Sequence, residues 1–301
     1  MDLNLLVAFE ALYLERSVTR AGRRLGLSQP ATSAALAKLR ALLGDPLFVK
    51  TPRGLDPTER CEALAGPVRD ALADLRDALG HEEFDPKTTD RVFRIGAVDA
   101  AIAVVIPRLI TRVQRAAPHA LLEIRSIDPG NAVALLDARE IELALAPIPT
   151  LPRHMMSRDL FPLVFALCMR PDHPIAAQPT AAEIAAYPHV VVAFAGLGRT
   201  PMDEALQAAG VRRHVSVAVG SFLAVPEIIA DCDALAVLPL PYANKLARAG
   251  RVRIAPLPNP LAQPPRTMHL AWPARLDTSR AWRWLRDEVA AASRRALAPG
   301  G

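Results

Sequence analysis

The sequence predicts an α/β protein with an N-terminal winged helix-turn-helix, a long linker helix and a two-lobed α/β domain. Two short helices joined by a tight turn, within residues 17–43, predict the first part. Apolar residues spaced alternately three and four apart after residue 58 predict the linker helix. Strands that alternate with helices from residue 91 onward predict two lobes built on parallel sheets.

The composition sets limits on the class of protein. A chain of 301 residues has the length for two or three domains. No run of about 18 apolar residues exists in it, so we expect no membrane span. The three cysteines, Cys61, Cys168 and Cys232, are far apart in the sequence. They argue against a disulfide framework or structural metal site and favour a reducing cytoplasm.

The segment SVTRAGRRLGLSQPATSAALAKLRALL predicts the helix-turn-helix. Ser17 is a good N-cap for a first helix that runs to about Leu25. Gly26 suits the turn because a residue without Cβ takes positive φ at little cost, and Leu27 is expected to return to the core. Ser28 then caps a second helix. The second helix of this pair is expected to lie in a DNA major groove.

The second helix has two predicted faces. The residues expected to face inward are Ala31, Ala35, Leu39 and Leu42. The residues expected to face outward are Pro30, Ser33, Ala34, Ala37 and Arg40. Most of these outward side chains are small, so the helix can approach base edges closely. Gln29 has the amide geometry that pairs with adenine, and Pro30 and Ala34 suit a thymine methyl group.

Positive charge is concentrated in the same region. Residues 16–53 contain eight cationic residues and one anionic residue, Asp45, so the net charge of this segment is +7. The whole chain carries +5, so the remainder carries −2. The cations are Arg16, Arg20, Arg23, Arg24, Lys38, Arg40, Lys50 and Arg53. This distribution suits a phosphate-facing surface, and the alternative is that the cations are simply solvated helix faces.

The next segments predict a wing and a linker. Residues 46–55 read as a hairpin whose tip is 51–54, where Arg53 either reaches the minor groove or is an exposed turn arginine. A helix from Thr58 to about Leu79 carries an apolar seam that suits pairing of two chains, although Pro67 interrupts it. The seam residues are Ala65, Val68, Leu72, Leu75 and Leu79.

The run from Asp2 to Thr58 strongly resembles the N-terminal DNA-binding domain of LysR-type transcriptional regulators. The motifs RRLGLSQPATSAALAKLR and LGDPLFVKTPRG carry the likeness. The opening LNLLVAFEAL is similar to the branch of nodulation and aromatic-degradation activators. The family often has Arg or His where Ala34 stands, which indicates a different operator preference. Together, residues and resemblance predict these DNA contacts: Thr19, Arg23, Ser28, Gln29, Pro30, Thr32, Ser33, Ala34, Lys38, Arg40 and Arg53.

The resemblance also implies a linker helix that forms the dimer and a ligand-binding second domain. We expect boundaries at 1–58, with the helix-turn-helix at about 18–37, at 59–86 for linker and hinge, and at 87–301 for the effector domain. The pattern of strands and helices predicts a periplasmic-binding-protein-like pair of lobes. Lobe I comprises about 91–162 and 267–301, and lobe II about 163–266.

Ligands of such modules bind outside the carboxyl ends of strands, near helix N-termini. The residues expected there are Val98, Asp99, Ala100, Gly198, Arg199, Thr200, Ser221, Phe222 and His269. Arg199 is placed to hold a carboxylate, or is a surface arginine. Asp99 and Ser221 bind the ligand or only cap helices, Phe222 suits the core, and His269 suits a structural role. The family often has Ser or Thr where Val98 stands, which weakens the case for a simple carboxylate ligand. Residues 100–103 are apolar, so an apolar or aromatic effector is expected.

Other classes of protein fit less well. The sequence has no GxSxG, Walker or HExxH motif, so we expect no enzyme, cofactor or metal. The chain opens on an amphipathic helix rather than a signal peptide, which favours the cytoplasm. The expected partners are double-stranded DNA with a two-fold operator, a small organic effector and further copies of the chain as a homodimer or homotetramer. The alternatives are a DNA-binding regulator without a ligand and a solute-binding protein.

Overall fold

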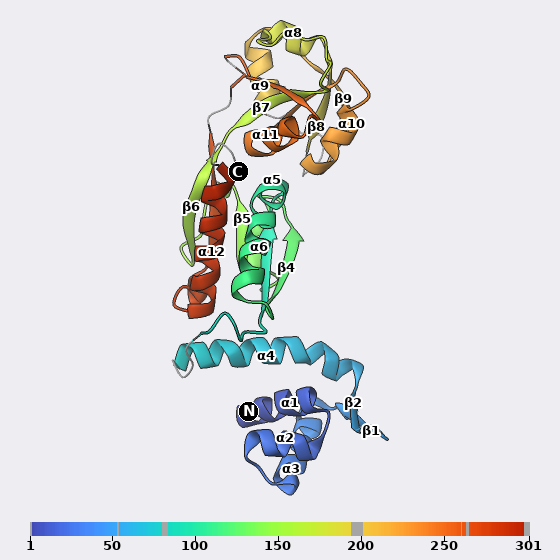
Figure 1. Ribbon diagram of the computed structural model, residues 1–301, viewed down its shortest axis with the longest axis vertical. Coiled ribbons are helices and arrows are strands. Elements are labelled where there is room, and N and C mark those ends of the chain that lie inside the picture. The colour runs from blue at the N-terminus through green and yellow to red at the C-terminus, as the bar shows by residue number, and fades with distance from the viewer. Residues whose placement is uncertain are drawn as a thin grey trace. The chain divides into compact units, whose positions relative to one another are not determined.

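The computed structural model describes residues 2–52, 54–79, 84–193, 201–259, 261–262 and 265–297 (Figure 1). The chain divides into two compact units between Phe84 and Asp85. Each unit has its own hydrophobic core and is described separately.

The N-terminal unit contains three short helices, a two-stranded hairpin and a long helix. The elements are α1 (Asn4–Glu15), α2 (Val18–Leu25), α3 (Gln29–Leu43), β1 (Phe48–Thr51), β2 (Gly54–Pro57) and α4 (Glu59–Leu79). The β1–β2 hairpin is antiparallel and forms the predicted wing. The hydrophobic core of the N-terminal unit is formed by α1 to α3, the wing and the start of α4. It contains Phe9, Leu12, Leu39, Phe48 and Cys61.

The predicted caps at Ser17, Gly26 and Ser28 are confirmed. The Ser17 hydroxyl accepts a hydrogen bond from the Arg20 N–H, and the Ser28 hydroxyl accepts one from the Ala31 N–H. Gly26 and Gly44 end α2 and α3 at φ angles of 67° and 63°. These conformations favour glycine because it has no Cβ to clash with the following carbonyl.

The predicted faces of α3 require a correction. The residues that α3 buries are Thr32, Leu36 and Leu39, whereas Ala31 and Leu42 are exposed. Leu27 is exposed as well and does not return to the core. The reason lies at Gly22, where an added Cβ would meet the Thr32 Oγ1 at 2.8 Å. This close contact between α2 and α3 rotates the buried stripe by about one residue.

The linker helix α4 begins after Thr58, whose hydroxyl accepts a hydrogen bond from the Cys61 N–H at 3.1 Å. Pro67 lies inside α4 without ending it. The first half of the predicted seam, with Ala65 and Val68, packs against the core of the same unit. Leu75, further along, is 37% exposed.

The second unit contains two lobes, each with a five-stranded sheet within the described residues. Lobe I has the strand order β4-β3-β5-β12-β6, where the strands are β3 (Val92–Ala97), β4 (Leu121–Ser126), β5 (Leu143–Ala146), β6 (Met155–Leu163) and β12 (Arg266–Pro273). Lobe II has the order β11-β7-β10-β8-β9, where the strands are β7 (Phe165–Met169), β8 (Pro188–Val192), β9 (His214–Val219), β10 (Leu235–Pro239) and β11 (Arg253–Ala255).

Both sheets are mixed rather than purely parallel, because β12 and β7 run antiparallel to their neighbours. Lobe I carries α5 (Asp99–Val104), α6 (Ile106–Ala116), α7 (Ala132–Asp137), η2 (Ala274–Leu276) and α12 (Arg280–Leu297). Lobe II carries α8 (Ala181–Ala185), α9 (Pro201–Ala208), η1 (Phe222–Ala224), α10 (Val225–Ile229) and α11 (Leu240–Arg248). Figure 1 shows α12 running alongside lobe I.

Two elements of the second unit differ from the prediction. The sequence does not predict strand β6, because Ser157, Arg158 and Asp159 are polar and exposed. Among the described strands, β6 lies at the edge of its sheet and pairs with β12. The stretch 100–116 has a pattern that favours one continuous helix, but it forms two helices that meet at Val105. Pro107 has no N–H to donate to the Ala103 carbonyl, so the helix cannot continue with regular bonding.

The chain passes between the lobes at two places. Only Val164 separates β6 from β7, and its carbonyl accepts a hydrogen bond from the Leu240 N–H at 2.8 Å. The return passage leads from β11 in lobe II to β12 in lobe I.

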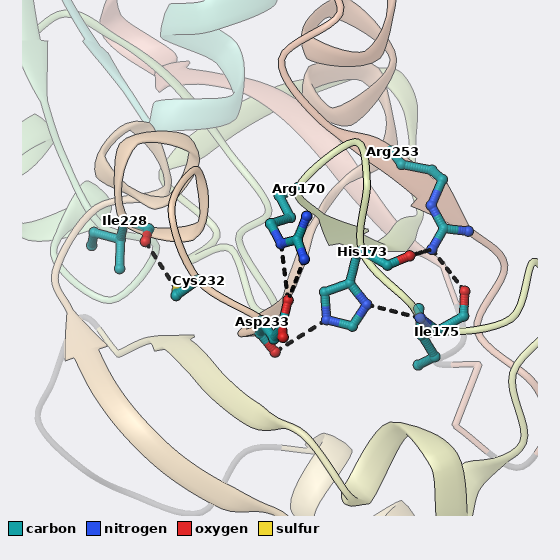
Figure 2. A network of polar contacts seen from close by, with 7 residues as sticks. All are labelled: Arg170, His173, Ile175, Ile228, Cys232, Asp233 and Arg253. Carbon is teal, nitrogen blue, oxygen red and sulfur yellow. Dashed lines mark hydrogen bonds and ion pairs between the residues drawn. The ribbon is translucent and has the colours of Figure 1, made fainter.

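A polar network in lobe II fixes the loop that follows β7 (Figure 2). Arg253 donates to the carbonyls of His173 and Ile175 at 2.7 Å each. The Nδ1 of His173 accepts from the Ile175 N–H, which leaves Nε2–H to donate to the Asp233 carbonyl at 3.1 Å. Arg170 forms an ion pair with the Asp233 carboxylate at 2.8 Å. These contacts join the loop after β7 to Asp233 and to Arg253 of β11.

Candidate functional site

The outer face of α3 is the first candidate site. Gln29, Pro30, Ser33, Ala34 and Lys38 are all exposed. The helix therefore presents an amide, small side chains and one cation to solvent. Thr19, Arg23 and Ser28 are exposed beside them.

Charge on this face is available for an outside partner. Arg20 and Arg24 form ion pairs with Glu15. Arg23 and Lys38 form no ion pair within the described part of the chain. Unpaired exposed cations of this kind are the ones that phosphates attract.

Two of the predicted DNA contacts, buried Thr32 and exposed Arg40, make hydrogen bonds within the N-terminal unit. The Thr32 side chain is fully buried, and its hydroxyl donates to the Ser28 carbonyl at 3.0 Å. The Arg40 guanidinium donates to the carbonyls of Pro46 and Phe48 at 2.7 and 2.9 Å. Thr32 is therefore a packing residue of the α2–α3 contact, and Arg40 fixes the start of the wing relative to α3.

The wing is attached firmly to the rest of the N-terminal unit. The Leu55 N–H donates to the Arg16 carbonyl at 3.0 Å. Gly54 has a φ of 131°, and a Cβ there would lie 2.6 Å from the same carbonyl oxygen. Only glycine fits this approach. Arg53 at the tip lies outside the described residues.

A cavity of about 400 Å³ between the two lobes is the second candidate site. Val98, Ala100 and Pro147 of lobe I and Val191, Phe165 and Phe222 of lobe II are among the side chains that line it. The lining is mostly apolar, and Arg213 and Arg266 are the charged residues among its described members. An apolar cavity with a few polar groups is typical of a small-molecule site.

The expected effector residues fall into three groups. Val98, Ala100 and Phe222 line the cavity, whereas Gly198, Arg199 and Thr200 lie outside the described residues. His269 does not line it, because its Nδ1 lies 2.9 Å from the Asp159 carboxylate on the neighbouring strand.

Asp99 and Ser221 bind each other rather than facing the cavity. Asp99 is 4% exposed, and its Oδ2 accepts hydrogen bonds from the Ser221 hydroxyl at 2.6 Å and the Phe222 N–H at 2.8 Å. The Ser126 hydroxyl approaches the other carboxylate oxygen at 3.5 Å. The Ser221 hydroxyl also accepts from the Leu223 N–H, as a capping residue does.

Sequence reasoning missed the charged residues of the cavity region. Arg213 is nearly buried and donates to the Asp203 carboxylate at 2.7 Å. Arg266 is exposed, and its guanidinium forms no hydrogen bond or ion pair with the described residues. His189, on β8 beside the lining residue Val190, is buried, and its Nε2–H donates to the Ile184 carbonyl. Burial lowers the pKa of His189 to about 4, so its imidazole is neutral near pH 7.

No group of three or more His, Cys, Asp or Glu side chains in the described part of the chain is arranged to hold a metal ion. No described helix has both the length and the apolarity that crossing a membrane requires.

The fold and the exposed α3 face define a winged helix-turn-helix regulator with a two-lobed second domain. Comparison with known families agrees for both parts. Residues 3–62 match "Bacterial regulatory helix-turn-helix protein, lysR family", and residues 87–294 match "LysR substrate binding domain". The chain therefore belongs to the LysR family of transcriptional regulators.

Individual relatives match over nearly the whole chain. The chain is 34% identical to the transcriptional activator NahR of Pseudomonas putida over 289 residues, covering 95% of this chain and 96% of that one. It is 35% identical to Nodulation protein D 1 of Rhizobium leguminosarum bv. phaseoli, covering 99% and 95%. The crystal structure of the probable transcriptional regulator PA0477 from Pseudomonas aeruginosa is similar, with a TM-score of 0.63, 32% identity and 96% of each chain covered.

Proposed function

We propose that this LysR-type regulator reads a two-fold DNA operator through α3 and the wing, as a homodimer or homotetramer in the cytoplasm. The observation that carries the proposal is the exposed face of α3, where Gln29 stands among small side chains with Lys38 and Arg23 beside it. Gln29 is the proposed base reader, and Lys38 and Arg23 are proposed phosphate contacts. The exposed Leu75 on α4 supports pairing of linker helices between chains.

We further propose that the interlobe cavity binds a small apolar or aromatic effector. The apolar lining supports this chemistry, and Arg266 suits an anionic group on the same molecule. NahR is named an activator, which supports activation as the direction of control. An effector that fits the cavity controls the regulator only through its different affinity for two arrangements of the subunits.

The DNA proposal is tested with Gln29→Ala on an operator selected from a pool of random duplexes. We expect a loss of about 1–3 kcal/mol on the selected operator and little change on random DNA. Lys38→Met is the matched control, because loss of a phosphate contact weakens binding to both and lowers the salt slope by about one. Equal losses for Gln29→Ala on both duplexes would reject it as a base reader.

The effector proposal is tested by thermal shift of the full chain with a panel of aromatic acids, phenols and uncharged aromatics. A ligand at 100 times its Kd should stabilise the protein by about 2.7 kcal/mol. Ala100→Phe fills the cavity and should abolish that shift, whereas Ala138→Phe on the lobe I surface should not. A shift that persists in Ala100→Phe places the ligand elsewhere, and no shift across the panel favours a regulator without a ligand.

A further inference from the structure

The short helix α5 belongs to lobe I by sequence but is held at both ends by lobe II. At its first residue, the Asp99 carboxylate accepts from the Ser221 hydroxyl and the Phe222 N–H. Near its last residue, the Lys245 ammonium of α11 donates to the Ala103 carbonyl at 2.8 Å. Both contacts join residues more than 120 positions apart in the sequence. They are therefore links between lobes rather than local caps.

The Lys245 contact replaces a backbone hydrogen bond that the sequence of α5 and α6 cannot form. In a continuous helix the Ala103 carbonyl would accept from residue 107, but residue 107 is proline and has no N–H to donate. An unmet carbonyl at a buried position costs free energy. Lys245 supplies the missing donor from the other lobe, so the break between α5 and α6 creates a docking point for α11.

The apolar side of α5 is also shared. Ala103 and Val104 are buried in the hydrophobic cluster of lobe II, together with Val190, Leu238 and Tyr242. Separation of the lobes on this side would expose those side chains, break the Asp99 contacts and strip Lys245 from its carbonyl. Loss of the Asp99 contacts costs the most free energy, because a buried carboxylate that loses its hydrogen bonds is strongly destabilised.

These links lie next to the cavity walls. Val98 and Ala100, which line the cavity, flank Asp99 in the sequence, and Phe222, another lining residue, follows Ser221. Any molecule that changes the position of these walls acts on the same segments that carry the links.

We propose that α5 is an interlobe latch that holds the two lobes closed before any effector binds. The latch consists of Asp99 with Ser221 and the Phe222 N–H at one end, and of the Ala103 carbonyl with Lys245 at the other. It sets the resting ratio of closed to open lobes, which is the ratio that an effector in the cavity would shift. The role of this latch in regulation rests on the proposed effector function, whereas its role in holding the lobes together does not.

The two serines around Asp99 provide a matched test. Ser221 donates to the carboxylate from lobe II, and Ser126 approaches it from lobe I. Ser221→Ala removes the 2.6 Å hydrogen bond to the Asp99 Oδ2, which joins the two lobes. Ser126→Ala removes a hydroxyl that lies 3.5 Å from the Asp99 Oδ1 within lobe I. Lys245→Met breaks the other end of the latch while keeping a long side chain.

The measurement is a distance distribution between spin labels at Ala138→Cys in lobe I and Ala249→Cys in lobe II of the full chain. The exposed Cys232 is replaced by Ser, and Cys61 and Cys168 are buried and escape labelling. Labelled chains are mixed with excess unlabelled chains so that only distances within one chain contribute. Neither DNA nor a small molecule is added, so a failure here leaves the proposed DNA and effector functions untouched.

We expect one narrow distance in the unaltered protein and in Ser126→Ala. Ser221→Ala and Lys245→Met should each add a longer component, as the ratio of closed to open lobes falls about tenfold. A distribution unchanged in both latch variants would overturn the proposal, as would equal broadening in Ser126→Ala. If Ser221→Ala does not fold, the Lys245→Met result alone decides.

Discussion

Gly22 should be intolerant of alanine, even though alanine is the better helix former. A Cβ at Gly22 would lie 2.8 Å from the Thr32 Oγ1 and 2.9 Å from the Leu27 carbonyl oxygen, against 3.4–4 Å for ordinary contact. The Leu27 backbone cannot retreat freely, because its own N–H donates to the Gly22 carbonyl at 2.8 Å. The added methyl group must therefore push α2 and α3 apart.

The magnitude follows from two opposing effects. Overpacking of a tight site costs about 1–3 kcal/mol, and the upper part of that range applies because one contact is with backbone. The better helix propensity of alanine returns about 1 kcal/mol. We expect a net loss of about 1–2 kcal/mol, which lowers the Tm of the N-terminal unit by about 5–15 °C.

The assay is thermal unfolding of the full chain followed by circular dichroism. Gly66→Ala is the control, because Gly66 lies inside α4 with no heavy atom within 4 Å of an added Cβ. The same substitution should raise stability there by about 1 kcal/mol. A Gly22→Ala protein that is as stable as the unaltered chain, while Gly66→Ala gains stability, would refute the contact argument.

Two further predictions concern stability in each unit. Arg40→Met should lower the stability of the N-terminal unit by about 1.5–3 kcal/mol in urea unfolding, because the Pro46 and Phe48 carbonyls lose a charged donor; Lys38→Met, on the exposed face, should change it little. Burial lowers the pKa of His189 from 6.5 to about 4, so the unfolded chain binds more protons between those pH values. Stability should fall by up to about 3 kcal/mol as pH drops from 6.5 to 4. His189→Gln should flatten this profile in thermal unfolding, and the exposed His119→Gln should leave it steep.

The helix ends of the N-terminal unit could be predicted from local sequence patterns. Ser17, Gly26, Ser28 and Gly44 act through their own backbone angles and near neighbours, so their roles are readable from the sequence. Thr32 was misread as a DNA contact because its burial depends on the missing Cβ of Gly22, ten residues earlier. A tertiary contact of that kind has no periodic signature.

In the second unit, the sequence predicts some residues of the cavity but not the contacts between the lobes. Val98, Ala100 and Phe222 were expected at the ligand site from their positions after strands, and they line the cavity. Asp99 and Ser221 were expected there too, but they are partners of each other across 122 residues. Pairing over such a separation depends on how two lobes meet, and neither residue type nor spacing encodes it.

The single residue Val164 between β6 and β7 leaves the chain no slack at this passage. Because β6 and β7 belong to different sheets, inserting or deleting one residue here would either move one lobe relative to the other or shift one of these strands along its sheet. Variants that lengthen the protein should therefore avoid this position. The spacing between the two lobes is set in whole residues and cannot be tuned gradually.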